Sequence, residues 1–195
     1  MGYSMDAISE DCYEGTTCLI NKLGIKDDKK LSEFESAITL AKASTLENES
    51  IEGNFDTEHY KAIHRFLFED IYDWAGIYRA VDMSKKGTAF AAADRIPDLM
   101  DSCFRRLKES DFFKGQPFDE YVKSIVDFYQ TTNMIHPFRE GNGRTQRIFI
   151  AQLIRFGGYD ISFSEIDSDE LMIATVQAAN GVPDYLEQLF AASIK

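Results

Sequence analysis

The sequence predicts a mainly α-helical fold, a helical bundle around one central buried helix with a short β-hairpin beside it. Three observations support this. Apolar residues recur at three- and four-residue spacing in several segments. Residues 148–156 are apolar on nearly all sides, which is typical of a helix buried in the core. Residues 79–90 combine strand-tolerant residues with a turn-like sequence.

The remaining elements follow in chain order. An apolar stripe runs through the second helix, which we expect to continue until Gly76. Pro137 disfavours continuation of the fourth helix through His136, and Gly157 and Gly158 end the central helix. The expected helices cover residues 30–46, 57–75, 94–108, 117–135 and 148–156, and two more begin near residues 168 and 183.

Length and composition define the class of protein. The 195 residues fit one domain, in which we expect a core over about 50–160 and an N-terminal extension over 1–20. A net charge of −12 disfavours direct binding to nucleic acid. No apolar run is long enough to cross a membrane, and the polar, acidic start does not match a secretory signal, so we expect a cytoplasmic protein. Three sparse cysteines predict reduced thiols.

Residues 136–147 carry the candidate chemistry. They read His-Pro-Phe-Arg-Glu-Gly-Asn-Gly-Arg-Thr-Gln-Arg and lie in the predicted loop before the central helix. Gly141 and Gly143 permit close approach of a ligand, and the amides at the start of a helix bind anions. Arg144 and Arg147 share a helical face, so both can reach one polyphosphate. These features favour phosphoryl or nucleotidyl transfer.

The same residues resemble the signature of the Fic family. That signature is His, any residue, Phe, any residue, Asp or Glu, Gly-Asn-Gly-Arg, two residues and Arg, and every fixed position is present here. From about Asn21 onward the chain also resembles small bacterial toxin-type members. The resemblance rests on Gly53, Asn54, Phe55, Asp56, Ile63, His64, Leu67, Phe68, Trp74, Ala75, Gly76, Arg79, Lys85 and Phe90. It implies a helical Fic fold with a hairpin flap.

The resemblance also implies an activity. Such a protein would transfer AMP from Mg-ATP to a Tyr, Thr or Ser hydroxyl of a target protein and release pyrophosphate. His136 would be the general base, and Glu140 would hold Mg²⁺. The phosphates would lie against Gly141, Asn142 and Gly143, with the Asn142 side-chain amide as a further donor.

The two motif arginines and the flap complete the implied site. Arg144 and Arg147 would contact the outer phosphates, with Arg147 on the γ-phosphate, whereas Phe138 would pack inward and anchor the loop. The flap would pair with the target's main chain by strand addition. Its residues are Met83, Ser84, Lys85, Lys86, Gly87, Thr88, Ala89 and Phe90.

The other histidines have simpler interpretations. His59 and His64 are five residues apart, do not share a helical face and do not form a metal pair. We interpret His64 as a structural hydrogen-bonding residue and His59 as a surface residue. Arg155 is interpreted as a surface or ion-pairing residue.

Regulation is also implied by the resemblance. Fic enzymes are commonly inhibited by a glutamate that pairs with the second motif arginine, here Arg147, in the pattern Ser or Thr, three residues, Glu, then Gly or Asn. Glu52 and Gly53 fit the end of this pattern, but Asn48 stands where the hydroxyl belongs. Glu187 fails too, because neither Gly nor Asn follows it. We expect a separate small antitoxin to supply the glutamate.

Several alternatives remain open at this stage. Toxin-type relatives suggest a type II topoisomerase as the target, and effector-type relatives suggest a small GTPase. The transferred group could be UMP, phosphate or phosphocholine, although the intact Gly-Asn-Gly-Arg favours AMP. A catalytically silent nucleotide-binding module is the non-enzymatic alternative, against which the intact His136 and Glu140 argue.

Overall fold

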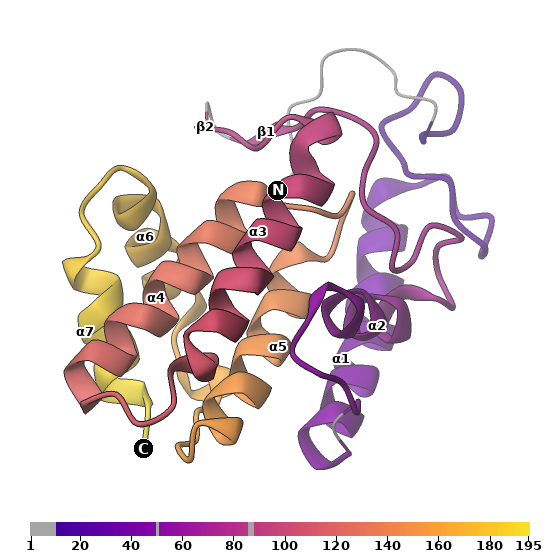
Figure 1. The fold of residues 1–195 in the computed structure, drawn as a ribbon. Coiled ribbons are helices and arrows are strands. Elements are labelled where there is room, and N and C mark those ends of the chain that lie inside the picture. Colours follow the sequence, from indigo (N-terminus) through magenta and orange to yellow (C-terminus); the bar gives the residue numbers. More distant parts are fainter. Residues whose placement is uncertain (1–10, 50, 86–87) are drawn as a thin grey trace.

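The structure is a computed structural model that describes residues 11–49, 51–85 and 88–195 (Figure 1). Residues 1–10 of the expected N-terminal extension and two flap residues, Lys86 and Gly87, lie outside the described residues. The fold is mainly helical, as predicted, with one small two-stranded antiparallel sheet in the described part.

Seven α-helices are present in the described residues. They are α1 (Asp28–Asn48), α2 (Thr57–Phe68), α3 (Ile96–Glu109), α4 (Phe118–Ile135), α5 (Asn142–Phe156), α6 (Ser168–Ala179) and α7 (Asp184–Ser193). The sheet consists of β1 (Ser84–Lys85) and β2 (Thr88–Ala89), in the register Ser84 to Ala89 and Lys85 to Thr88.

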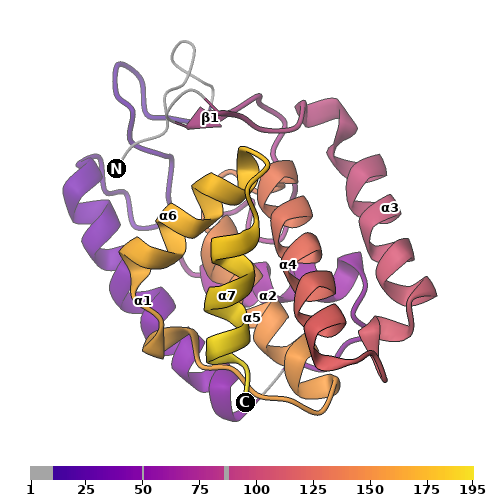
Figure 2. The same ribbon diagram turned by 90° about the vertical axis from the view of Figure 1, so that its left-hand side faces the viewer.

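The central helix is α5, which packs against α2 on one side and α4 on the other. Helix α1 packs against α2, whereas α3, α6 and α7 pack against α4. Both ribbon views place the hairpin at one end of the bundle (Figures 1 and 2). The prediction of a central buried helix and an edge hairpin is therefore confirmed.

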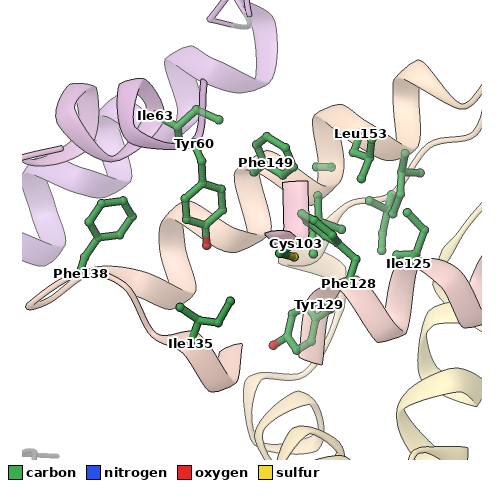
Figure 3. Packing of buried hydrophobic residues seen from close by; sticks show 14 of the residues in the cluster. Tyr60, Ile63, Cys103, Ile125, Phe128, Tyr129, Ile135, Phe138, Phe149 and Leu153 are labelled. Atoms are coloured by element: carbon green, nitrogen blue, oxygen red, sulfur yellow. The ribbon is translucent and has the colours of Figure 1, made fainter. Parts of the chain in front are cut away.

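Aromatic rings form the centre of the core (Figure 3). Phe149 of α5 is fully buried and makes edge contacts with Tyr60 and Phe104, at ring-centroid distances of 5.3 and 5.4 Å. Phe138, also fully buried, stacks on Tyr60 at 5.8 Å. The loop before α5 is therefore packed into the same core as the helices themselves, as expected for Phe138.

The second helix is shorter than predicted. It ends at Phe68, and the chain turns there, because the amide of Ile71 donates to the carbonyl of Phe68. Ile71 stays fully buried, and its own carbonyl accepts the amide of Lys22. The hydroxyl of Tyr72 donates to Glu35 of α1. These contacts with distant segments stabilise the turn relative to a longer helix. The periodic apolar pattern alone therefore predicted a helix that was too long.

The interpretation of His59 as a surface residue was wrong. Its side chain is buried, with ring contacts to Phe55 at 5.2 Å and Phe149 at 5.5 Å. Burial lowers its pKa. A Cβ atom at Gly53 would lie 2.3 Å from the His59 ring, so the preceding loop closes over the imidazole only because residue 53 is glycine.

The cysteines and the lengths of the apolar helices were the other expectations. All three cysteines are buried thiols, and burial raises the pKa of Cys103 to about 12. No helix in the described residues is long and apolar enough to span a bilayer.

Candidate active site

The site is built on the segment that joins α4 to α5. The side chain of Asn142 closes this segment, because its Oδ1 accepts the Phe138 amide at 2.8 Å and its Nδ2 donates to the Phe138 carbonyl at 2.7 Å. The side-chain amide of Asn142, predicted as a donor to phosphates, is buried and uses one of its two N–H groups to close the loop. Its contact with phosphates stays a prediction.

His136 ends α4 in a left-handed conformation, with φ of 50° and ψ of 62°. A non-glycine residue in this region costs about 1–3 kcal/mol and is held by its surroundings. Its Nδ1 lies 3.3 Å from the Asn133 carbonyl, which can only accept, so Nδ1 carries the proton. The lone pair is then on Nε2, as a general base requires. The ring of Phe90 stacks on the imidazole at 3.8 Å.

The N-terminus of α5 is open. The helix begins at Asn142, earlier than expected, so the residues from Asn142 to Arg147 lie in its first turns and not in a loop. Its N-cap is Gly141 in a left-handed conformation, and no side chain caps it. A Cβ atom at Gly141 would also lie 2.2 Å from Phe68. The first amides of the helix are therefore available to an anion, on the positive end of the helix dipole.

Glu140 lies at the edge of this helix end. Its Oε1 accepts the Gly141 amide at 2.7 Å and the Arg144 guanidinium at 3.2 Å. Its side chain is 26% exposed, and its Oε2 receives no hydrogen bond from the described residues. A single carboxylate of this kind fits Mg²⁺ when substrate phosphates supply other ligands. The described residues hold no cluster of three or more metal-binding side chains.

Arg144 is neutralised by two carboxylates. One of its guanidinium nitrogens pairs with Glu35 of α1 and with Glu140, and another donates to Thr39 at 3.0 Å. Tyr72 donates to the second Glu35 oxygen at 2.6 Å, so the buried carboxylate is satisfied from both sides. Burial lowers the pKa of Arg144, but the two carboxylates raise it by more. Its positive charge is therefore largely balanced within the protein.

Arg147 has a different environment, although it is only one turn away. No ion pair involves it in the part of the chain that the structure describes, whereas Arg139, Arg144 and Arg155 pair with carboxylates. Burial lowers its pKa, and the charge of Arg144 adds to this effect. A half-buried cation without a counter-charge at an open helix N-terminus attracts an anion. Of the two arginines, Arg144 is therefore paired within the described residues and Arg147 is not, and their contact with the outer phosphates stays a prediction.

His64 is a structural hydrogen-bonding residue, as predicted. The Gly76 amide donates to its Nδ1 at 2.8 Å, so Nε2 carries the proton and donates to the Glu140 carbonyl at 3.0 Å. Burial lowers the pKa of His64 to about 3, the Glu140 carbonyl opposes this, and Arg144 lowers it further. The neutral imidazole thereby fixes the backbone next to the candidate metal ligand.

The predicted flap forms beside His136. Residues Ser84, Lys85, Thr88 and Ala89 make its two strands, and the amide of Phe90 donates to the carbonyl of Met83 at 3.1 Å. Met83 is buried, so it anchors the hairpin, whereas Ala89 is exposed. The described flap residues are in place, and their role in target binding stays a prediction.

Sequence reasoning missed three supporting residues. Glu35 lies 109 residues from Arg144 and 37 from Tyr72 in the sequence, and no local pattern connects it to either of them. The buried Arg139 pairs with Asp11 at 3.3 Å, so residue 11 of the expected extension supports the segment between α4 and α5. Arg79 was part of the resemblance only, yet its guanidinium donates to the His136 carbonyl. Burial is the signal they share, and it is not visible in one sequence.

Together these features define a class of protein. A base, a carboxylate, an unpaired arginine and an open helix N-terminus meet in one short segment, which suits binding and reaction of a phosphate-containing ligand. The model of the Fic/DOC family matches residues 54–154, more than half of the chain. The chain belongs to the Fic/DOC family.

Curated relatives carry names that agree with the family. Protein adenylyltransferase VbhT of Bartonella schoenbuchensis is 35% identical over 179 residues, 92% of this chain and 37% of VbhT. Probable protein adenylyltransferase y4lH of Sinorhizobium fredii is 33% identical over 172 residues, 87% of this chain and 88% of the relative. The chain thus spans just over a third of VbhT but most of y4lH.

Solved structures show the same fold. BepC of Bartonella tribocorum with bound AMPPNP superposes with a TM-score of 0.88 at 29% identity, covering 95% of this chain and 96% of BepC. The type IV secretion system effector protein BepA has a TM-score of 0.88 at 32% identity, covering 95% of this chain and 68% of BepA. The predicted Fic fold is confirmed.

We predict that Glu35→Ala lowers the free energy of unfolding by about 2–4 kcal/mol, because it leaves Arg144 with one carboxylate and Tyr72 without its acceptor. Urea denaturation at neutral pH measures this change. Glu33→Ala is the matched control, since Glu33 is exposed on the same helix, and surface changes of this kind stay within about 0.5 kcal/mol. Equal effects of the two substitutions would contradict the buried network.

We predict that acid destabilises the protein through His64. Its folded pKa of about 3 lies below its ordinary value, so the stabilisation is complete above pH ~6.5 and is lost as the pH falls towards 3. Between pH 7.5 and pH 5 this single group removes about 2 kcal/mol of unfolding free energy. Denaturation of His64→Gln across the same range should show a shallower dependence. A slope equal to that of the unsubstituted protein would refute the assignment.

Proposed function

We propose that the protein transfers AMP from Mg-ATP to a hydroxyl group of a target protein. The observation that carries this proposal is Arg147, a cation without a counter-charge beside the open N-terminus of α5 and in the same short segment as His136 and Glu140. Relatives named protein adenylyltransferase support the kind of reaction, and the bound AMPPNP of BepC supports ATP as the ligand.

The reaction follows from the placement of the base. Nε2 of His136 takes the proton of the target hydroxyl while the hydroxyl oxygen attacks the α-phosphorus of ATP. A bond from this oxygen to the α-phosphorus forms, and the bond from the α-phosphorus to the bridging oxygen breaks. Pyrophosphate leaves with the electron pair. The acceptor is a Tyr, Thr or Ser side chain.

The chain's own residues hold and neutralise the triphosphate. The first amides of α5, at Asn142 and Gly143, bind phosphate oxygens, and Arg147 balances the charge of the γ-phosphate. Glu140 would hold Mg²⁺, which would supply positive charge to neutralise the phosphates of the bound nucleotide. Arg144, already paired, acts mainly by orienting Glu140. We place the reaction in the cytoplasm, where Mg-ATP is abundant.

The target segment would lie along the flap. An edge strand with unpaired amides and carbonyls accepts an extended peptide by main-chain pairing, and β1 with β2 forms a hairpin whose base lies next to His136. Type II topoisomerases and small GTPases are the candidate targets. Transfer of UMP, phosphate or phosphocholine, or nucleotide binding without reaction, are the alternatives that the experiment must separate.

We predict that the protein labels a target when given Mg²⁺, bacterial lysate and ATP labelled at the α-phosphate, and not when the label is on the γ-phosphate. The base contributes about 10²–10⁴-fold, so His136→Ala should lose nearly all of the label. Gel autoradiography measures both. Label from the γ-phosphate would establish a kinase-like reaction instead. ATP binding by calorimetry without any labelled product would support the silent module.

We propose further that a small antitoxin restrains this activity, as in a toxin–antitoxin pair. A groove of about 680 Å³ runs between α1 and α5, with Leu40, Ala43, Ile148 and Ala151 among its apolar lining residues and Arg147 exposed to it. Leu40 is 73% exposed. An amphipathic helix with a glutamate near its polar edge fits this surface, because that carboxylate would pair with Arg147 and exclude the γ-phosphate.

The internal candidate, Glu52, is poorly placed for this role. The loop that contains it packs at the C-terminal end of α5, where Phe55 contacts Phe156 at 4.7 Å, whereas Arg147 lies near the N-terminal end. We predict that Glu52→Gly leaves the rate of AMP transfer by the isolated protein within about twofold, because side chains away from the site contribute little. A large rise in label incorporation would show inhibition within the chain and remove the need for an antitoxin.

A further inference from the structure

Arg79 has an unusual environment for an arginine. It is 5% exposed, and its guanidinium donates only to backbone carbonyls in the described residues. The Nε donates to His136 at 2.8 Å, Nη1 to Val81 at 2.5 Å, and Nη2 to Ala91 at 2.6 Å and Ile135 at 3.3 Å. Four acceptors around the planar guanidinium fix its orientation. A lysine has a single side-chain nitrogen and cannot make the same four hydrogen bonds.

The four carbonyls come from two different parts of the site. Val81 and Ala91 flank the flap on its two sides, one before β1 and one after β2. Ile135 and His136 end α4, where carbonyls have no partner within the helix. Arg79 therefore joins the two stems of the flap to the end of the helix that carries the base.

Backbone contacts strengthen the same junction. The amide of Arg79 donates to the Pro137 carbonyl at 2.9 Å, and the amide of Ala91 donates to the Met134 carbonyl at 3.1 Å. Phe90, the residue between β2 and Ala91, stacks on His136. A shift of the flap would therefore break contacts with the backbone of the base as well as with its ring.

We propose that Arg79 is a positioning residue that holds the flap and His136 as one rigid unit, so that a hydroxyl bound on the flap stays aligned with Nε2. The proposal rests on the proposed function, since alignment matters only if the flap carries the acceptor. Misplacement of reacting groups by about 1 Å can cost about 10²-fold in rate. Arg79 makes no hydrogen bond to the residues proposed to bind the triphosphate. Its substitution should therefore change the rate of transfer and leave nucleotide binding unchanged.

The test compares Arg79→Lys with the unsubstituted protein in three measurements. Amide hydrogen exchange of Phe90 and Ala91 should accelerate about tenfold or more, because local opening of the flap becomes easier. Transfer from α-labelled ATP to the lysate target should fall about 10²-fold. The affinity for Mg-ATP, measured by calorimetry, should stay within about threefold, because Arg147 and the α5 amides are unchanged.

Controls separate positioning from a general loss of structure. Arg155→Lys alters an arginine paired at the surface with Asp160, and it should leave flap exchange and transfer unchanged. Exchange of the amides of Phe149 and Ile150 reports on the core. Unchanged flap exchange in Arg79→Lys, or acceleration that is equal in flap and core, would overturn the proposal.

If Arg79→Lys does not fold, Phe90→Ala is the second variant, because it removes the ring that stacks on His136. It should give faster amide exchange in the flap and slower AMP transfer at unchanged Mg-ATP affinity. Unchanged flap exchange together with unchanged transfer would overturn the coupling. If the unsubstituted protein transfers no label at all, the proposed function fails, whereas the exchange data still show whether Arg79 joins the flap to His136.

Discussion

The pair of hydrogen bonds between the Asn142 side chain and the Phe138 backbone is the constraint on which the site depends. It closes a tight loop whose hydrophobic residue, Phe138, enters the aromatic core. Closure brings the end of α4 next to the start of α5, and it leaves the first amides of α5 without a side-chain cap. A helix end of this kind is usually satisfied by a cap or a ligand. Here the fold keeps it available, and the stabilisation that a cap would provide is replaced by packing of Phe138 between Tyr60 and His64.

The charges around this loop are divided between structure and ligand. Arg144 is balanced by Glu35 and Glu140 and fixes α1 against the loop, whereas Arg147 has no ion-pair partner among the described residues, and burial lowers its pKa. If both arginines were unpaired, two nearby cations would repel each other in the absence of ligand; if both were paired, the site would be neutral. Pairing one of them makes the loop stable and still leaves an anion site. The net charge of −12 over the whole chain makes this local positive position more distinct.

The segment that joins α4 to α5 is also held by three segments distant in sequence. His64 of α2 holds the Glu140 carbonyl, Asp11 pairs with the buried Arg139, and Arg79 joins the flap to His136. None of these residues contributes a reacting atom. Because His136 occupies a left-handed conformation that an isolated peptide rarely adopts, the loop needs such support to keep the imidazole in place before a substrate arrives.

The sequence by itself determined the helical class, the central buried helix, the flap and the segment 136–147, because periodic apolar spacing, glycines and a dense motif are local signals. It also gave His64 a structural role, and the resemblance to the Fic family gave Phe138 one. It could not determine the end of α2, the burial of His59 or the different environments of Arg144 and Arg147. Each of these depends on a partner far along the chain: Lys22 and Glu35 for the turn after α2, Phe149 for His59, and Glu35 again for Arg144. Two arginines at helical spacing look equivalent in a sequence, and only the tertiary structure decides which one meets a buried carboxylate.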